Sequence, residues 1–296
     1  MRHLEFAIEP QRIRDLRDLK YLESRFGFAK GSLISNVPKS WYSTVAERLV
    51  LDLGQVNQTR LTQLLKDIKT KCLYKSGRNG TGGNWLDIAL QNHDEWPFHR
   101  IIEGSLNEPP VKINCLDELG DNDFEGIQSV LRDAQSLANA SKALLIGAEK
   151  VTIVDPYLCP SKNGSRETLL RMMALCEKRS IEFHIFCEDD NIAHWARNCV
   201  DALNNFKRQI PNNITLSWSN LTDDDTGFLH RRMLFTGKGG LVYDRGFAEP
   251  NAHHQREITT PVMLMESPDV EVAAIDYNLA QLNPILSLVN PTWFSK

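Results

Sequence analysis

Residues 228–247 read FLHRRMLFTGKGGLVYDRGF, and this stretch places polar side chains at the start of a strongly apolar segment. Two apolar runs flank the glycine-rich residues 236–240, a connection of hairpin length, so the pattern predicts a β-hairpin. Because residues two apart in a strand share a face, we expect His230 and Arg232 to point into the same space and Arg231 to point away. An imidazole and a guanidinium on one face suit a phosphate or another oxyanion. The alternative interpretation is a sheet-edge histidine and arginine that meet solvent or a structural carboxylate.

Helices and strands alternate on both sides of this hairpin. Before it, apolar strand patterns are separated by helical patterns, and after it one strand is followed by a closing helix. Such alternation predicts an α/β sandwich with a mixed sheet. The expected strands are residues 151–154, 181–187, 213–218 and 261–265, and the expected helices are residues 124–138, 167–179, 192–206 and 270–286.

The N-terminal part of the chain lacks this alternation. Apolar residues recur at helical spacing around residues 13–22 and 61–68, which predicts a mainly helical domain. The paired prolines at positions 109–110 stop regular structure and favour an extended linker. We therefore expect a mainly helical domain over residues 1–110 and an α/β domain over residues 111–296.

The composition is that of an ordinary globular protein. Of the 296 residues, 42% are apolar, which is ample material for a core, and the net charge is −4. No apolar run reaches the length of a membrane span, and the N-terminus MRHLEFAIEP has no basic start followed by an apolar stretch, so we expect a cytoplasmic protein. The six cysteines are scattered without a CxxC pair, which argues against a zinc site and against a disulfide framework. We expect neither a metal ion nor a cofactor.

A basic cluster lies in the expected helical domain. Lys69, Lys71, Lys75 and Arg78 follow one another closely and run into a glycine-rich loop at residues 76–84. The basic side chains, with backbone amides of the loop, can hold a nucleic-acid backbone. The alternative interpretation is a solvated helix face that ends in a loop.

The segment around His230 resembles a degenerate half-site of the phospholipase D superfamily, whose pattern is His-x-Lys followed by an aspartate and a Gly-Ser-x-Asn turn. His230 matches the histidine, and Arg232 stands where the lysine would be. Gly237 occupies the position of the aspartate, and no Gly-Ser-x-Asn turn follows. The resemblance implies a phospholipase D-like mixed-sheet α/β sandwich for residues 111–296.

A closer resemblance is to the phospholipase D-like C-terminal domain of MIT-domain proteins. That domain has Leu-His-x-Arg on one strand, Arg-Gly on the next, and a Glu-Thr-Thr stretch before a further strand. The corresponding segments here are LHRR at residues 229–232, RGF at 245–247 and EITT at 257–260. That domain binds lipid rather than hydrolysing it, so this resemblance argues against assuming catalysis and implies a binding module.

Further polar residues are expected beside the motif. Asp155 and Tyr157 belong to a DPY sequence that ends an expected buried strand, a position where loops carry binding sites. A similar DPY occurs at the pocket rim of phospholipase D-like relatives, and the alternative here is a turn that caps the strand. Glu257 can orient the histidine of the motif, or pair with Arg232 or Arg245.

These residues lead to two functional hypotheses. In the first, the chain is a phosphodiester-binding protein that acts on nucleic acid, a metal-independent nuclease of a bacterial antiviral-defence or mobile-element system. The resemblance then implies that His230 attacks phosphorus while Arg232 holds the non-bridging oxygens. A second histidine must protonate the leaving group, and it would come from the other protomer of a homodimer. In the second hypothesis, the chain is a catalytically inactive module that binds lipid headgroups or a protein partner.

Overall fold

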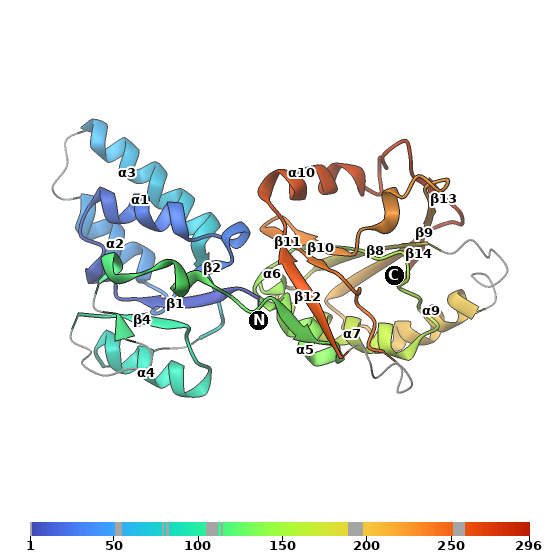
Figure 1. The fold of residues 1–296 in the computed structure, drawn as a ribbon, viewed down its shortest axis with the longest axis horizontal. Helices are drawn as coiled ribbons and strands as arrows, with labels where there is room; N and C mark the ends of the chain where they lie inside the picture. Colours follow the sequence, from blue (N-terminus) through green and yellow to red (C-terminus); the bar gives the residue numbers. More distant parts are fainter. Residues whose placement is uncertain are drawn as a thin grey trace. The chain divides into compact units, whose positions relative to one another are not determined.

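The computed structural model describes residues 2–50, 55–78, 80, 83–104, 112–113, 115–188, 198–250 and 258–296. The chain forms two compact units, an N-terminal unit of His3–Gly126 and a C-terminal unit of Ile127–Lys296, to which Arg2 also belongs. Each unit is built around its own sheet (Figure 1). The boundary expected between positions 110 and 111 falls outside the described residues, and the N-terminal unit continues beyond it to Gly126.

A parallel sheet organises the N-terminal unit. Its strands are β1 (Leu4–Ile8), β2 (Ser32–Ser35), β3 (Leu73–Tyr74), β4 (Arg100–Ile102) and β5 (Lys112–Ile113). Their order across the sheet is β3-β2-β1-β4-β5, with β1 at the centre. Phe6 of β1 pairs with Ile34 on one side and with Arg100 on the other, both in parallel.

Helices cover both faces of this sheet (Figure 1). Phe6 and Ile8 of β1 pack into the core on one face, and Ala7 between them packs with Ile88 and Ala89 on the other. This alternation follows from the two-residue period of a strand. The first face is covered by α1 (Leu16–Arg25), α2 (Trp41–Val50) and α3 (Gln55–Asp67), and the second by α4 (Trp85–Glu95).

The expectation of a mainly helical N-terminal domain is therefore wrong in architecture, because a sheet lies between the helices. The expected helices at residues 13–22 and 61–68 are present within α1 and α3. The sequence pattern did not predict these strands because they are short. For example, β2 is the four-residue segment SLIS. A buried run of that length carries no periodic signal.

The sheet of the C-terminal unit is mixed, as the sequence predicts. β7, β8 and β9 are parallel neighbours, and the hairpin strands β10 and β11 join them in antiparallel fashion. The order is β13-β9-β8-β7-β10-β11-β12-β6, and β14 also pairs with β9. The strands are β6 (Ser129–Leu131), β7 (Lys150–Val154), β8 (Ile181–Glu188), β9 (Ile214–Thr222), β10 (Met233–Thr236), β11 (Gly239–Tyr243), β12 (Thr259–Leu264), β13 (Ser287–Leu288) and β14 (Trp293–Phe294).

Helices flank this sheet too, which makes the unit a mixed α/β structure (Figure 1). One face carries α10, whose buried Ala273 packs in a core cluster with Val154, Met233 and Phe235 of the sheet. The other helices lie on the opposite side of the sheet in Figure 1. The helices are α5 (Ala134–Ala140), α6 (Lys142–Leu145), α7 (Asn163–Ala174), α9 (Val200–Phe206) and α10 (Ser267–Asp276).

The hairpin predicted within residues 228–247 is confirmed. Met233 pairs with Val242 and Thr236 pairs with Gly239, so Gly237 and Lys238 form the turn between the two strands.

No helix in the described part of the chain is both long enough and apolar enough to cross a membrane.

Candidate functional site

His230 and Arg232 do not lie on the hairpin strand. β10 begins at Met233, and residues Phe228–His230 form a single 3-10 turn instead. Gly227 enters this turn in the left-handed conformation, with φ of 78°. The carboxylate of Asp223 holds the turn, since its Oδ2 accepts a hydrogen bond of 2.9 Å from the Leu229 amide. The expectation that His230 and Arg232 share a face of a strand is therefore wrong, because neither residue lies on the strand.

His230 is exposed to solvent on this turn. Its attraction to Asp223 is one of the influences that lower the pKa of that carboxyl, after the hydrogen bond from Leu229 and others. No hydrogen bond involves the imidazole among the described residues. Glu257, for which the sequence analysis left open a contact with His230, Arg232 or Arg245, lies outside those residues.

Arg232 lies in a different environment, although it is only two positions away. Its Nε is 4.0 Å from Oδ1 of Asp155, and its guanidinium carbon is 4.8 Å from the ring centroid of Tyr157. One terminal nitrogen donates a hydrogen bond to the carbonyl oxygen of Asp244. The side chain is 28% exposed. The guanidinium is therefore held in place by a carboxylate and an aromatic face, and part of it reaches solvent.

Asp155 anchors this arrangement from the end of β7. It is 2% exposed, and its two oxygens accept hydrogen bonds of 3.0 Å, Oδ1 from the Tyr157 amide and Oδ2 from the Phe247 amide. Burial raises the pKa of this carboxyl, while the two amides and Arg232 act in the opposite direction. The sequence analysis left open a binding residue or a turn that caps the strand. The structure shows that the side chain closes the turn and faces Arg232, and a role in binding stays a prediction.

Gly246, in the Arg-Gly sequence after the hairpin, lies close to the side chains of Asp155 and Arg232. Its φ is 74°, a conformation that L side chains rarely adopt, and a Cβ atom there would lie 2.4 Å from Oδ2 of Asp155 and 3.2 Å from Cδ of Arg232. Glycine thus allows the loop after β11 to approach both side chains. The adjacent Arg245 is held by its backbone, whose amide donates to Oγ1 of Thr260 at 3.0 Å.

We call Asp155, Tyr157, Arg232, Arg245 and Gly246 the Arg232 site. These residues come from the turn after β7, the position just before β10 and the loop after β11. Lys162, just before α7, adds positive charge that Asp155 experiences. The sequence analysis named four of the five as site residues, and it named Gly246 only as part of the motif. Chemically, an arginine fixed in this way offers N–H groups to an oxyanion.

The basic cluster belongs to the N-terminal unit and is described on its own. Lys69, Lys71 and Lys75 are all exposed. Lys69 and Lys71 lie on a π-helical turn, Ile68–Cys72, that ends α3. The Lys69 ammonium lies 4.6 Å from the ring centroid of Tyr42, and Nζ of Lys71 is 3.8 Å from Oδ1 of Asp67. These weak contacts leave the lysines on the surface. Their positions are compatible with both interpretations of the sequence, a solvated face and a nucleic-acid contact.

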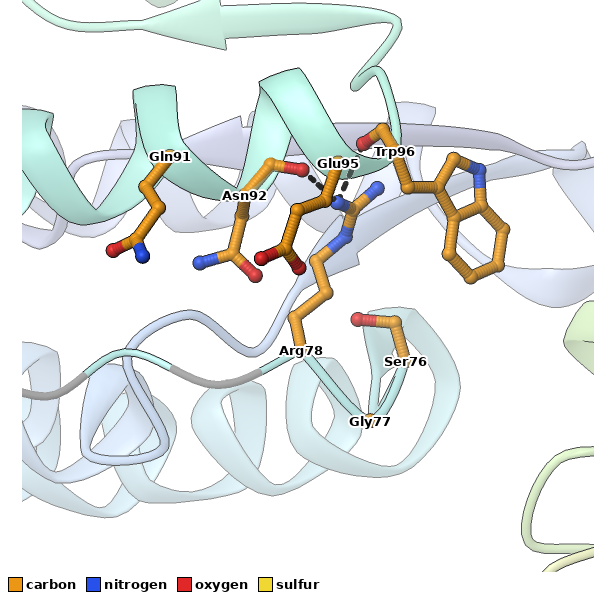
Figure 2. Close-up of a pocket in the computed structure, with 7 residues that line it drawn as sticks. All are labelled: Ser76, Gly77, Arg78, Gln91, Asn92, Glu95 and Trp96. Atoms are coloured by element: carbon orange, nitrogen blue, oxygen red, sulfur yellow. Dashed lines mark hydrogen bonds between the residues drawn. The ribbon is translucent and has the colours of Figure 1, made fainter.

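Arg78, which the sequence groups with these lysines, is buried. Its guanidinium donates to both oxygens of Glu5 and to the carbonyl oxygens of Asn92 and Trp96. Figure 2 shows the side chain beneath the end of α4, with the bonds to these two carbonyls. The ring of Phe98 stacks against it at 3.8 Å. Because its donors are occupied within the protein, Arg78 has a structural role and does not belong to the basic surface.

A polar cavity of about 310 Å³ opens beside Arg78 (Figure 2). The sequence analysis did not identify it, because its residues come from a loop and a helix that carry no shared motif. The carboxylate of Glu95 and the amide of Gln91 extend from α4 along this cavity. The lining residues are Ser76, Gly77, Arg78, Gln91, Asn92, Glu95 and Trp96.

Within the described ranges, no three His, Cys, Asp or Glu side chains gather closely enough to hold a metal ion.

No protein-family model matches the sequence, and a search of curated proteins finds no significant match. The likeness to phospholipase D-like domains thus stays an expectation carried by the motifs.

Proposed function

We propose that this protein binds a phosphodiester group at the Arg232 site of a divergent phospholipase D-like unit, without hydrolysing it. The observation that carries this proposal is the geometry of Arg232. Its guanidinium lies between Asp155 and Tyr157, donates one hydrogen bond to the Asp244 carbonyl, and remains partly exposed. An arginine that is held by its neighbours loses little side-chain freedom when it binds a phosphate through two N–H groups.

The position of His230 favours binding over hydrolysis. A phosphohistidine mechanism needs a nucleophilic imidazole aligned with the phosphorus atom that the arginine holds, and a second group that protonates the leaving oxygen. His230 is exposed on the turn before β10, and no contact joins it to Asp155 or Arg232 in the part of the chain that the structure describes. Gly237, at the position of the family's aspartate, lies in the turn of the hairpin and has no carboxylate.

One observation favours the second candidate, a metal-independent nuclease of a defence or mobile-element system. His230 lies near enough to Asp223 to contribute, after several hydrogen bonds, to the lowered pKa of that carboxyl, and a carboxylate beside a histidine can orient the imidazole for catalysis. In that case a second imidazole would come from the other protomer of a homodimer. This candidate requires the phosphodiester to reach both Arg232 and His230.

For the ligand we propose nucleic acid, because the N-terminal unit exposes Lys69, Lys71 and Lys75 within a short stretch. Such lysines bind a polyphosphate backbone without reading its sequence. A lipid headgroup offers the same phosphodiester chemistry to Arg232, and a protein partner is the remaining alternative from the sequence analysis.

The test measures binding and cleavage in the same samples. The wild-type protein, Arg232→Ala and His230→Ala are titrated against a labelled single-stranded oligonucleotide and against phosphatidylcholine vesicles with and without phosphatidylglycerol, an anionic phosphodiester lipid. We expect Arg232→Ala to weaken oligonucleotide binding by roughly 10-fold or more, since a hydrogen bond to a charged group contributes about 1.5–3 kcal/mol. His230→Ala should bind as the wild type does, and no sample should cleave the oligonucleotide.

The matched control is Arg171→Ala, which removes an exposed arginine that pairs with Glu167 on the surface of α7. It should bind as the wild type does. Cleavage by the wild type that is lost in His230→Ala would establish the nuclease instead. Binding to phosphatidylglycerol vesicles and not to the oligonucleotide would replace nucleic acid by a lipid as the ligand. Equal binding by Arg232→Ala and the wild type would exclude the Arg232 site as the binding site for either ligand.

A further inference from the structure

Two thiols from distant parts of the chain meet in the C-terminal unit. The Sγ atoms of Cys159 and Cys199 are 3.8 Å apart, although 40 positions separate the two residues. Cys159 lies in the loop between β7 and α7, and Cys199 directly precedes α9. A disulfide bond is about 2.05 Å long, so the sulfur atoms need to approach by less than 2 Å, which side-chain rotation and a small backbone shift can supply.

We propose that Cys159 and Cys199 are an oxidative modification site, at which a small-molecule disulfide such as oxidised glutathione converts the two thiols to an intramolecular disulfide. The sequence offered no sign of this pair, because the two cysteines lie in no CxxC motif. Their proximity arises from the fold alone, which brings the loop after β7 against the start of α9.

The exposure of the two thiols sets the order of the reaction. Cys159 is half-buried and Cys199 is fully buried, so the oxidant reaches Cys159 first. Oγ of Ser161 lies 3.0 Å from Sγ of Cys159 and can donate a hydrogen bond to its thiolate. A hydrogen-bonded thiolate at an accessible position is the form that attacks disulfides.

The two steps balance in atoms and electrons. The thiolate of Cys159 attacks one sulfur of the oxidised glutathione, which forms a mixed disulfide and releases one glutathione thiolate. Cys199 then gives its proton to solvent and attacks Sγ of Cys159, which releases the second glutathione thiolate. In total the two protein thiols lose two protons and two electrons, and the glutathione disulfide takes up two protons and two electrons to become two thiols.

A cavity beside the pair gives the oxidant room. It has a volume of about 560 Å³, and Ser161 and Asn198, which are close in sequence to the two cysteines, belong to its lining. Arg166 and Asp201 also line it. A tripeptide disulfide with carboxylate and ammonium groups has complementary charges for both of these side chains.

Other cysteines of the chain supply contrasting controls. Burial raises the pKa of Cys72 and of Cys176 to about 12, so both stay protonated and unreactive near neutral pH. The thiol of Cys176, just after α7, also donates a hydrogen bond to the carbonyl oxygen of Met172 in that helix. Replacing Cys176 therefore tests a thiol that the proposal does not involve.

The disulfide would tie down the segment that carries Tyr157 and Lys162, because Cys159 lies between them. This consequence rests on the proposed function, whereas formation of the disulfide does not. Oxidation should slow hydrogen exchange at amides of residues 157–162 and alter oligonucleotide binding at the Arg232 site.

The experiment treats the intact wild-type protein with oxidised glutathione, then denatures it and alkylates the remaining thiols. We expect two fewer of the six cysteines to be alkylated, and peptide mass spectrometry to find Cys159 joined to Cys199. Cys199→Ala should stop at the glutathione adduct on Cys159, and Cys159→Ser should form neither product. Cys176→Ser should form the disulfide as the wild type does.

Several outcomes would overturn the proposal. Six alkylated thiols after oxidation, or a cross-link between other cysteines, would exclude this pair. Protection from alkylation that a chelator removes and a reductant does not would mean that the thiols bind a metal ion. Because none of these measurements uses a phosphodiester ligand, failure of the proposed function leaves them interpretable.

Discussion

The guanidinium of Arg78 and the carboxylate of Glu5 form a two-pronged ion pair in the interior of the N-terminal unit. Nε of Arg78 lies 3.0 Å from Oε1 of Glu5, and Nη2 of Arg78 lies 2.8 Å from Oε2. The side chains are 4% and 2% exposed. Glu5 stands on the central strand β1, and Arg78 follows β3, so the pair connects the middle of the sheet to the loop after its edge strand.

Removing one partner of this pair should destabilise the N-terminal unit strongly. Glu5→Gln leaves the Arg78 charge buried without its counterion, which costs about 3–5 kcal/mol in comparable buried pairs. Urea unfolding followed by far-UV circular dichroism measures the change. Arg17→Met is the control, because its pair with Asp15 is exposed and contributes at most about 1 kcal/mol. A similar small loss in both variants would mean that water reaches the Arg78 pair.

Acidification should destabilise the N-terminal unit through His99. Burial lowers the pKa of this histidine below its ordinary value, and its Nε2 lies 2.8 Å from the carbonyl oxygen of Asp123. The unfolded chain therefore takes up a proton near pH 6.5 that the folded chain takes up only at lower pH. The stability contributed by neutral His99 is complete above about pH 6.5 and is lost as the pH falls towards the folded-state pKa.

Thermal unfolding at pH 7.5 and pH 5.5 checks this expectation. The unfolding temperature of the wild type should be lower at pH 5.5 than at pH 7.5. In His99→Gln this difference should be smaller, because glutamine does not titrate. The comparison is made within each variant, so any loss of packing from the substitution appears equally at both pH values. An identical fall in the wild type and the variant would assign the pH dependence to other groups.

The sequence predicted the C-terminal unit better than the N-terminal one, for a physical reason. Strands such as Ile181–Glu188 and Ile214–Thr222 are long and separated by amphipathic helices, so each leaves a clear pattern. In the N-terminal unit, Leu73–Tyr74 is a strand of only two residues. Such a strand is defined by its hydrogen bonds to a neighbour, and these pairings are invisible in a single sequence.

The surroundings of Arg232 could be anticipated in part. Asp155 and Tyr157 lie beside Arg232 because they follow the end of a strand, whereas their role in binding stays a prediction. The placement of His230 could not be anticipated, because the Leu229 amide donates a hydrogen bond to Asp223, six positions earlier, and the turn that this bond holds delays the start of β10 to Met233. Arg78 was misassigned for a related reason: its partner Glu5 is 73 positions away in the sequence.

Gly246→Ala tests how closely the loop after β11 must approach Asp155. A Cβ atom at this position would lie 2.4 Å from Oδ2 of Asp155, and the φ of 74° is itself strained for alanine. We expect a loss of about 1–3 kcal/mol in unfolding free energy and weaker phosphodiester binding. Gly237→Ala is the matched control, because a Cβ atom there meets nothing within 4 Å, and it should change stability by less than about 1 kcal/mol. Equal stability of the two variants would show that the loop can move away from Asp155.

The basic cluster gives the last expectation, which separates a nucleic-acid contact from a solvated surface. Replacing Lys69, Lys71 and Lys75 by glutamate should weaken oligonucleotide binding and flatten its dependence on salt. Each phosphate contact on duplex DNA contributes roughly 0.9 to the slope of log affinity against log salt concentration, and about 0.7 on single strands. Three lost contacts on a single strand should therefore lower the slope by about 2.

The control makes the same change in net charge with other exposed lysines, Lys20, Lys39 and Lys207. Because a change in overall charge acts on both variants alike, only a local contact can make their slopes differ. Fluorescence anisotropy over a series of salt concentrations measures both. If the two variants lose the same slope, the cluster acts only through net charge, and the lysines are a solvated face of the N-terminal unit. If only the first variant loses slope, the lysines contact phosphates directly.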